Sequence, residues 1–331
     1  MQKTKTTSIA LCTCDGARYL AEQIESILKQ TQLPDEIVIC DDVSTDNTAQ
    51  IIDFYKKTAP LPILFIQNST RIGTIKNFEK AITACSGDII FLADQDDFWK
   101  PNKIKLSVQV LNNNPSCGYV FSDAELTDSH LDLKLGNLWE AIGFTNNRFN
   151  KYCSGDQLPV MLTGGNFIYG NTMAFRGIYK QLIIPILSTY YSCAHDTWIS
   201  ILLSSLGFYG VPIPEPLIYY RQHDKQQAGA GKKISTTDKI GHILRNKIDF
   251  FDGHRKSIEA IRDRVHLFSH GSHKESEDTL NQLIAHYHIR AALYKKSGLS
   301  KLKSIVSELR TGRYSRFSQS WKSAIKDFLT I

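Results

Sequence analysis

The chain has 331 residues, of which 42% are hydrophobic and 22% charged, and its formal net charge is +6. This composition excludes fibrous and low-complexity proteins, and the length suits a catalytic domain with an appendage. Met1–Thr7 is too polar for a secretory signal peptide. The longest uncharged stretch, Thr197–Pro214, contains glycines and prolines, so we expect no membrane span. The odd number of cysteines, seven without a C-x-x-C pair, favours reduced thiols in the cytoplasm.

Charge is distributed unevenly along the chain. Residues 232–331 contain 20 Lys and Arg against 10 Asp and Glu, a net charge of +10, whereas residues 1–231 carry a net charge of −4. A basic C-terminal region is attracted to anionic surfaces, and on charge alone both a membrane leaflet and a nucleic acid qualify.

Apolar strands alternate with amphipathic helices through the first hundred residues. The expected strands are Ser8–Thr13, Glu36–Cys40, Leu61–Gln67 and Asp88–Ala93. The expected helices between them are Ala17–Gln30, Thr48–Lys57 and Thr74–Ala84. This order predicts an α/β fold with a parallel, doubly wound, Rossmann-like sheet and right-handed crossovers.

The rest of the chain is less regular. A helix begins at Pro101, short strands are expected at Cys117–Phe121, Phe167–Phe175 and Leu217–Tyr220, and a helix at Asp196–Leu206. We expect a mobile loop between Asn137 and Asn150, a flexible joint at Gly229–Lys233 and only helices over Lys239–Leu309. The predicted domains are therefore a catalytic domain, 1–230, and a basic helical region, 231–331.

Three carboxylates, Asp94, Asp96 and Asp97, follow directly on the apolar run 88–92. Carboxylates packed this closely repel one another unless a cation or solvent neutralises them. Open α/β sheets bind their ligands at the carboxyl ends of the strands. A divalent metal that bridges to a diphosphate explains the cluster, and a solvated acidic turn is the alternative.

Three further polar clusters stand at strand ends or helix starts. Thr13–Gly16 and Asp41–Asp42 follow the first two strands, and Ala194–Asp196 opens a later helix. Parallel topology brings the first two clusters and the acidic one to the same edge of the sheet. This convergence favours a binding site over a generic solvated surface.

At this point the chain resembles the family 2 glycosyltransferases, which have the GT-A fold. The matching elements cover roughly the first two-thirds and are Ser8–Thr13 with Gly16, Ser26–Thr31, Glu36–Thr48 and the D-x-D-D motif with Pro101. The chain departs from the family pattern at two places. Cys14-Asp15 replaces the usual Tyr-Asn, and Val43 replaces the usual Gly.

The resemblance implies roles for individual residues in donor binding. Asp42 would accept a hydrogen bond from the base, Asp94 would reach the ribose, and Lys76 and Arg221 would meet the phosphates. For Lys76 a plain surface cation is an equal alternative. The full nucleotide-binding set is Thr13, Asp15, Asp42, Arg71, Lys76, Asp94 and Arg221. The set implied for Mg²⁺ or Mn²⁺ is Asp94, Asp96 and His223.

The resemblance also implies an inverting reaction in which Asp196 is the catalytic base. The N-terminus of a helix stabilises the ionised form of a carboxylate, and this form can take the acceptor's proton. The alternative is that Asp196 only caps the helix. Asp97 is the next candidate for the base. The implied acceptor-binding residues are Gly170, Asn171, Thr172, His195 and Trp198.

Finer motifs resemble the bacterial rhamnosyltransferase-like branch of the family. They are Arg71–Gly73, Lys76–Phe78, His195–Trp198 and Tyr220–His223. This match implies transfer of L-rhamnose from dTDP-rhamnose to a glycan acceptor, lipid-linked, in O-antigen or capsule biosynthesis, without a nucleic acid partner. Alternatives are a UDP-hexose donor (galactose, glucose or N-acetylhexosamine), a non-catalytic nucleotide-sugar-binding protein, and a nucleotidyltransferase. The last would need a Gly-rich phosphate loop, and Thr13–Arg18 has one glycine.

The C-terminal segment from Arg313 to Leu329 places apolar residues at helical spacing with Lys and Arg between them. This pattern predicts an amphipathic helix in an anionic membrane interface, at the inner face of the cell membrane. The alternative is a helix that packs on its own domain. The seven His between 242 and 288 are too scattered for metal ligands and are expected on helix surfaces.

Overall fold

A computed structural model of the chain describes residues 5–163, 165–187, 194–224, 226, 239–318 and 320–329. The chain forms two compact units. Unit 1 contains residues 1–145, 167–186 and 208–231, and unit 2 contains residues 146–166, 187–207 and 232–331. Unit 2 thus adds two inner segments to the C-terminal region expected from the sequence. The predicted joint at Gly229–Lys233 lies outside the described residues.

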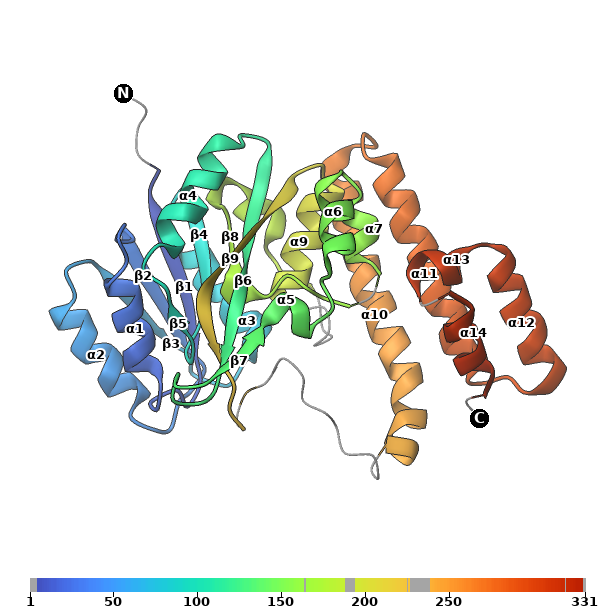
Figure 1. The fold of residues 1–331 in the computed structure, drawn as a ribbon, viewed down its shortest axis with the longest axis horizontal. Helices are drawn as coiled ribbons and strands as arrows, with labels where there is room; N and C mark the ends of the chain where they lie inside the picture. Colours follow the sequence, from blue (N-terminus) through green and yellow to red (C-terminus); the bar gives the residue numbers. More distant parts are fainter. Residues whose placement is uncertain are drawn as a thin grey trace. The chain divides into compact units, whose positions relative to one another are not determined.

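Unit 1 is built on one mixed sheet, which Figure 1 shows with its helices. Its strands are β1 (Thr7–Thr13), β2 (Glu36–Asp41), β3 (Ile63–Gln67), β4 (Ile89–Asp94), β5 (Phe98–Trp99), β6 (Cys117–Thr127), β7 (Lys134–Asn137), β8 (Met173–Arg176) and β9 (Tyr209–Arg221). The strand order is β3-β2-β1-β4-β8-β6-β9-β5, and β7 pairs with β6. The first four strands are parallel, as the sequence predicts.

The helices of unit 1 connect these strands and cover the sheet. They are α1 (Leu20–Leu28), α2 (Thr48–Thr58), α3 (Thr74–Ala84), α4 (Lys103–Asn113), α5 (Leu138–Ala141) and α8 (Lys180–Ile183), with short 3₁₀ turns η1 (Gly170–Thr172) and η2 (Gly177–Tyr179). Every residue of β1 is buried, as is β4 up to Asp94. Strands covered on both faces read as continuous apolar runs, which is why the sequence identifies them clearly.

The second half of the sheet differs from the sequence prediction. β8 pairs antiparallel with both β4 and β6, and it begins only at Met173, because residues 170–172 form η1. β9 has 13 residues and extends far N-terminal to the expected strand at Leu217–Tyr220. Its prolines at 212, 214 and 216 hide the strand pattern, and proline is tolerated in strands at edges and bulges. The register of β6 against β9 shifts beside them, between Ser122 and Glu125.

The segment expected as a mobile loop between Asn137 and Asn150 is instead largely helical. α5 opens it in unit 1, and α6 (Asn146–Cys153) follows in unit 2. Trp139 and Phe144 are buried in an aromatic cluster, in which Phe144 stacks on Phe167 at 4.1 Å between ring centroids. The polar Asn and Gly residues suggested a loop, but burial of the aromatic side chains between them stabilises an ordered structure.

Unit 2 is helical throughout its described part. Besides α6 it contains α7 (Gln157–Met161), α9 (His195–Ser205), α10 (Lys239–Ser269), α11 (Lys274–Leu293), α12 (Gly298–Arg310), α13 (Arg313–Phe317) and α14 (Ser320–Leu329). This agrees with the predicted C-terminal helical region. Among the described residues, no helix combines the length and the apolar character needed to cross a membrane.

Charged residues form part of the core of unit 2. Glu308 of α12 accepts hydrogen bonds from Arg313 at 2.5 and 2.7 Å and contacts His286 of α11 at 2.7 Å. Asp327 of α14 pairs with Arg290 at 2.7 and 3.0 Å. His286 is fully buried, so the expectation that all these histidines lie on helix surfaces is wrong for it. Spacing alone cannot reveal a histidine whose partner carboxylate lies 22 residues away.

This network makes unit 2 sensitive to acid. Its hydrogen bonds to Arg313 and His286 outweigh burial and lower the pKa of Glu308 from 4.5 to about 2. A carboxyl with a lowered pKa stabilises the folded state above the unfolded pKa and loses that contribution as pH falls through the folded value. Glu308→Gln should therefore be less stable than wild type near neutral pH by about 3 kcal/mol.

The difference should shrink between pH 4.5 and 2, because over this range the unfolded wild type binds a proton at Glu308 that the folded state does not. Urea unfolding followed by circular dichroism at a series of pH values would measure it. The exposed Glu275→Gln in α11 is the matched control and should follow wild type. A stability gap between wild type and Glu308→Gln that stays constant down to pH 2 would contradict this assignment.

Candidate active site

The three polar clusters predicted to meet at one sheet edge do so. Thr13 of β1 lies opposite Asp41 of β2, and Cys12 lies opposite Asp94 of β4. Gln95 joins the first and third clusters: its Oε1 accepts from the backbone N–H of Cys14 at 2.8 Å, and its Nε2 donates to the Cys14 carbonyl at 3.1 Å. A Cβ on Gly16 would lie 2.2 Å from Gln95 Oε1, so a larger residue at position 16 would displace the Gln95 side chain from these two bonds.

Thr13 is part of the supporting structure of this edge. Its hydroxyl donates to Asp41 Oδ1 at 2.8 Å, and both residues are buried. Asp41 in turn accepts from the backbone N–H of Ser44 at 2.9 Å and from the Ser44 hydroxyl. These bonds fix the turn that follows β2. The predicted nucleotide contact of Thr13 stays a prediction.

Asp42 organises the segment that leads into α3. Its Oδ1 accepts from Asn68 Nδ2 at 3.0 Å and from the backbone N–H of Ile72 at 2.8 Å, and its Oδ2 accepts from the N–H of Gly73 at 2.8 Å. A carboxylate offers about four acceptor positions, so these three bonds leave one for a further donor. That is compatible with the predicted contact to a nucleotide base.

Both departures from the family pattern fall at left-handed backbone positions. Asp15 has φ of 50° and Val43 has φ of 59°. Asp tolerates this region, whereas a β-branched residue there is strained. Bonds on either side hold Val43 in place: the N–H of Asp42 donates to the Thr13 carbonyl, and the N–H of Ser44 donates to Asp41. Val43 therefore holds this left-handed conformation at a cost on the order of 1–3 kcal/mol.

Asp15 and Arg71, both predicted in the nucleotide site, are in contact. Arg71 Nη2 lies 2.6 Å from Asp15 Oδ2, and Asp15 Oδ1 accepts from the N–H of Thr45 at 2.7 Å. The Thr45 N–H and then the Arg71 guanidinium lower the pKa of Asp15. Arg71 and Asp15 are both exposed. A surface ion pair of this kind is weak and can open to admit a ligand.

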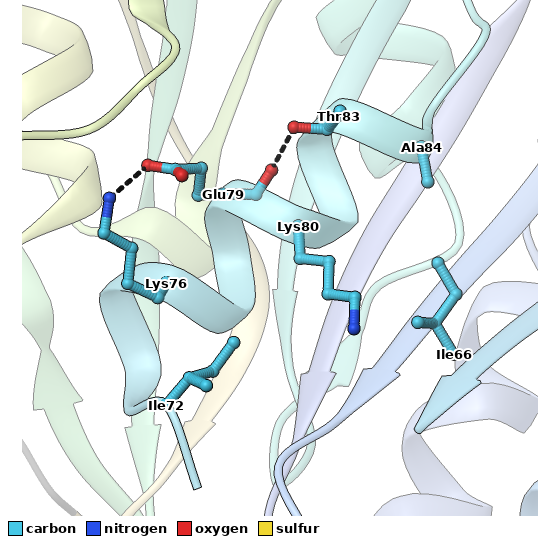
Figure 2. Close-up of a pocket in the computed structure, with 7 residues that line it drawn as sticks. All are labelled: Ile66, Ile72, Lys76, Glu79, Lys80, Thr83 and Ala84. Atoms are coloured by element: carbon cyan, nitrogen blue, oxygen red, sulfur yellow. Dashed lines mark hydrogen bonds and ion pairs between the residues drawn. The ribbon is translucent and has the colours of Figure 1, made fainter. Parts of the chain in front are cut away.

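Lys76 lines a pocket beside α3, together with Ile66, Ile72, Glu79, Lys80, Thr83 and Ala84. Figure 2 shows its ammonium directed at Glu79, and the Nζ–Oε2 distance is 2.8 Å. Lys76 Nζ also donates to the carbonyl of Ile186 at 2.9 Å. No residue of the acidic motif lines this pocket. Lys76 would have to leave Glu79 to meet a phosphate.

The acidic loop between β4 and β5 holds Asp96 against His223. Asp96 Oδ2 lies 2.8 Å from His223 Nε2, although 127 residues separate the two in the chain. The imidazole also contacts the ring of Tyr19, with 4.9 Å between ring centroids. The sequence prediction that residues 96 and 223 belong to one site is consistent with this contact.

Arg221 supports the loop from behind. The residue is buried, and its guanidinium donates to the carbonyls of Asp96 at 2.8 Å and Ser129 at 2.7 Å and pairs with Glu22 at 2.7 Å. It also stacks over Tyr19, 4.4 Å from the ring centroid. In this conformation each of its three nitrogens has a protein partner. Arg221 thus fixes the loop backbone, and the predicted phosphate contact is not visible in this state.

The side chains around Asp96 fit a divalent cation that is also bound by the phosphate oxygens of a nucleotide. In the described part of the chain, no three His, Cys, Asp or Glu side chains converge closely enough to form an all-protein metal cage. Magnesium sites commonly use one or two carboxylates together with substrate phosphate oxygens and water. Asp96 supplies one such carboxylate and Asp94, at the end of β4, could supply a second, while His223 Nε2 adds an imidazole nitrogen beside Asp96 Oδ2.

A buried polar layer behind the loop was not foreseen from the sequence. Asp97 is fully buried and accepts from Asn171 Nδ2 at 2.6 Å. Lys103 of α4, also buried, donates to the Asn171 carbonyl at 2.5 Å and lies 4.3 Å from the Trp99 ring centroid. Burial lowers the pKa of Lys103 to about 7. Its position two residues after Pro101 was the only available signal, and spacing alone does not show burial.

Burial, followed by the charges of Asp96 and Asp94, raises the pKa of Asp97 well above its usual range. Asp97 is also fully buried, and its Oδ2 already accepts from Asn171, so its carboxyl group does not face a surface from which an acceptor could be reached in this conformation. Its role as the second candidate for the catalytic base stays a prediction. In this conformation Asp97 connects the loop that carries Asp96 to Asn171 in the protein interior.

The predicted acceptor residues fall in both units. In unit 1, Gly170, Asn171 and Thr172 form η1 and are buried, and Thr172 Oγ1 donates to the Tyr169 carbonyl at 2.7 Å. The side chain of Asn171 serves Asp97 rather than the surface. An acceptor contact by these residues stays a prediction.

In unit 2, His195, Asp196 and Trp198 lie in the first turns of α9 and are all buried in this state. Asp196 Oδ1 accepts from the N–H of Thr197 at 2.6 Å, so the carboxylate lies at the helix start as predicted. Burial lowers the pKa of His195. The role of Asp196 as a base stays a prediction.

Two solved structures with a similar fold contain a nucleotide sugar. Residues 1–349 of Staphylococcus aureus TarS, solved with UDP-GlcNAc, match with a TM-score of 0.59 at 14% identity, covering 98% of this chain and 89% of that one. The mannosyltransferase PcManGT of Pyrobaculum calidifontis, solved with GDP-Man and Mn²⁺, matches with a TM-score of 0.50 at 15% identity, covering 99% and 86%. At these identities the likeness shows the GT-A fold.

Sequence comparisons add the family. An uncharacterized glycosyltransferase of Nostoc sp. is 31% identical over 221 residues, which cover 65% of this chain and 64% of that protein. The dTDP-rhamnosyl transferase RfbG of Shigella flexneri is 26% identical over 268 residues, covering 77% and 84%. The sequence model of glycosyl transferase family 2 matches residues 8–182, more than half of the chain. The chain therefore belongs to glycosyl transferase family 2.

Proposed function

We propose that this protein is an inverting, metal-dependent glycosyltransferase that moves a sugar from a nucleotide donor to a glycan acceptor. The observation that carries the proposal is the contact between Asp96 and His223 at the carboxyl edge of the parallel strands. A carboxylate and an imidazole able to bind a divalent cation lie there, next to the turns that resemble the family's nucleotide-binding turns. The presence of Asp94, Asp96 and Asp196 together counts against a non-catalytic binding protein.

The reaction exchanges one bond at the anomeric carbon for another. The bond between that carbon and the diphosphate oxygen breaks, and a bond to an acceptor hydroxyl oxygen forms on the opposite face of the sugar. A bound Mg²⁺ or Mn²⁺ would neutralise the charge that develops on the leaving diphosphate. Asp96 and His223 would hold this ion, with Asp94 beside them. Asp196 would take the acceptor's proton.

The proposed donor is dTDP-L-rhamnose, supported by the match to dTDP-rhamnosyl transferase RfbG. The proposed acceptor is a lipid-linked glycan of bacterial surface polysaccharide biosynthesis, such as O-antigen or capsule. The enzyme would then work in the cytoplasm, peripherally at the inner face of the cell membrane. A UDP-hexose donor is the second candidate, favoured by the fold likeness to TarS, which was solved with UDP-GlcNAc.

The metal assignment predicts the behaviour of Asp96→Ala. Loss of a metal ligand should reduce turnover by roughly a hundredfold or more, because the cation contributes several kcal/mol to the transition state. Release of nucleoside diphosphate from the donor would be followed by a coupled assay. Asp53→Ala, an exposed acid of α2, is the control and should retain wild-type rates. Full wild-type activity in the presence of EDTA would show that no metal takes part.

The base assignment predicts a different signature for Asp196→Asn. The amide keeps the shape of the carboxylate but cannot accept the proton, so turnover should fall by roughly two to four orders of magnitude. Nucleotide affinity, measured by calorimetry, should change little. The control is Asp156→Asn, another carboxylate at a helix start in the same unit. Near wild-type turnover for Asp196→Asn would place the base on another residue.

A further inference from the structure

The C-terminal helices of unit 2 expose apolar side chains on one side and bury charged ones on the other. In α14, Ala324 and Asp327 are buried, whereas Trp321, Ile325 and Phe328 are exposed. Positions 321, 325 and 328 follow helical spacing and share one face, which the packing of α14 leaves uncovered. Trp321 is 59% exposed. Helix α14 therefore packs on the rest of unit 2 through the narrow face that contains Ala324 and Asp327, and its apolar face remains exposed to solvent.

α12, which packs against α14, shows the same division. Ile305 and Glu308 are buried, whereas the exposed apolar residues of the helix are Leu299, Leu302, Val306 and Leu309. These four also recur at helical spacing. Figure 1 shows α12 and α14 as neighbours in the C-terminal part of unit 2. We call the exposed apolar residues of the two helices the α12/α14 face.

The exposed apolar surface comes partly from a different part of the C-terminal region than the sequence pattern predicted. The sequence pattern predicted one amphipathic helix from Arg313 to Leu329. Tyr314 and Phe317 of α13 are instead buried, and Tyr314 belongs to a core cluster with Leu293, Ile305 and Ala324. Tyr314 also donates to Asp327 Oδ2 at 2.9 Å. Thus α13 is a packing element, and α12 takes its place beside α14.

The charges around the α12/α14 face are of one sign. Residues 298–329 contain two acids, Glu308 and Asp327, and both are buried in ion pairs with arginines. The exposed charged residues on the two helices are all basic: Lys303, Arg310, Lys322 and Lys326. Within residues 298–329, therefore, every exposed charge beside these apolar side chains is positive, which is complementary to an anionic lipid headgroup layer over an apolar interior.

A second copy of the chain fits this face poorly. A twofold interface would bring the same basic patch of two chains together, and like charges across an interface cost free energy. Tryptophan also suits the boundary between headgroups and acyl chains, because its ring has an apolar body and a polar N–H. The observations therefore favour a lipid surface.

We propose that the α12/α14 face docks this protein on an anionic membrane surface. The apolar side chains enter the headgroup boundary, and the basic side chains contact lipid phosphates. This proposal makes the membrane association put forward above specific. It rests on the proposed function in one respect, namely that the lipid-linked acceptor lies at the membrane. It does not depend on the chemistry at Asp96, so the two can be tested separately.

Trp321 provides a direct probe in the full-length chain. The chain has four tryptophans, and the other three, Trp99, Trp139 and Trp198, are buried. Vesicles of phosphatidylcholine with phosphatidylglycerol should therefore shift the tryptophan emission to shorter wavelength and sediment the protein. Vesicles of phosphatidylcholine alone should do so less. Added salt should weaken the binding because it screens the lysines.

The variant that tests the face is Leu302→Ser with Ile325→Ser and Phe328→Ser. All three side chains are exposed, so folding should be retained, and circular dichroism would verify it. Vesicle affinity should fall roughly tenfold or more, because three apolar side chains no longer enter the boundary. Ile178→Ser changes an equally apolar side chain, 78% exposed in unit 1, and should bind vesicles like wild type.

Two results would overturn the proposal. One is wild-type vesicle affinity in the folded triple variant. The other is a wild-type protein that does not bind anionic vesicles. If that wild-type protein is a dimer and the triple variant is a monomer, the α12/α14 face is a self-association surface. Donor hydrolysis is measured in parallel. Hydrolysis without vesicle binding defeats this inference alone, and vesicle binding without hydrolysis defeats the proposed function alone.

Discussion

Electrostatic repulsion among Asp94, Asp96 and Asp97 is the constraint on which the rest of the site depends. Three carboxylates within four residues cannot all stay ionised side by side without compensation. The structure separates them. Asp97 is buried behind the loop with Asn171 and Lys103, and Asp96 contacts His223 on the other side. Asp94 and Asp96 remain at the sheet edge, where the proposed cation would bind.

This separation depends on chain segments that are distant in sequence. Arg221 at the end of β9 holds the carbonyl of Asp96, and Gln95 connects the loop to the turn after β1. Because these contacts come from the scaffold, the loop is held without a ligand present. Preorganised groups of this kind stabilise developing charge without reorganising during the reaction. Loss of Arg221 would therefore disturb the site although the residue faces the interior.

Unit 2 also buries carboxylates together with basic partners, and there the result is a surface without exposed acids on α12 and α14. Glu308 and Asp327 are buried and paired with arginines, which leaves the outer surface of α12 and α14 apolar and basic. Removal of the acids from the surface creates the one-sided charge on which the membrane proposal depends. The same contacts also pack α13 and α14 onto α11 and α12.

The sequence predicted those features that depend on local pattern and topology. The four parallel strands, and the edge where Thr13, Asp42 and Asp94 meet, followed from apolar runs and crossover rules. The long strand β9 was missed because its prolines hide the alternation, and α5 was missed because Asn and Gly residues flank this short helix on both sides. The inward positions of Asp97, Lys103 and His286 could not be read from spacing, because burial is decided by partners elsewhere in the chain.

The central claim is that the acidic edge of unit 1 binds a divalent cation that carries the donor's diphosphate. Calorimetric titration of the full-length protein with UDP and with dTDP, with and without Mn²⁺, tests it most directly. Binding of metal and nucleotide at one place must be coupled, and the coupling is reciprocal. We expect Mn²⁺ to tighten the binding of at least one of the two nucleotides roughly tenfold or more. Equal affinities with and without Mn²⁺ for both nucleotides would contradict the account.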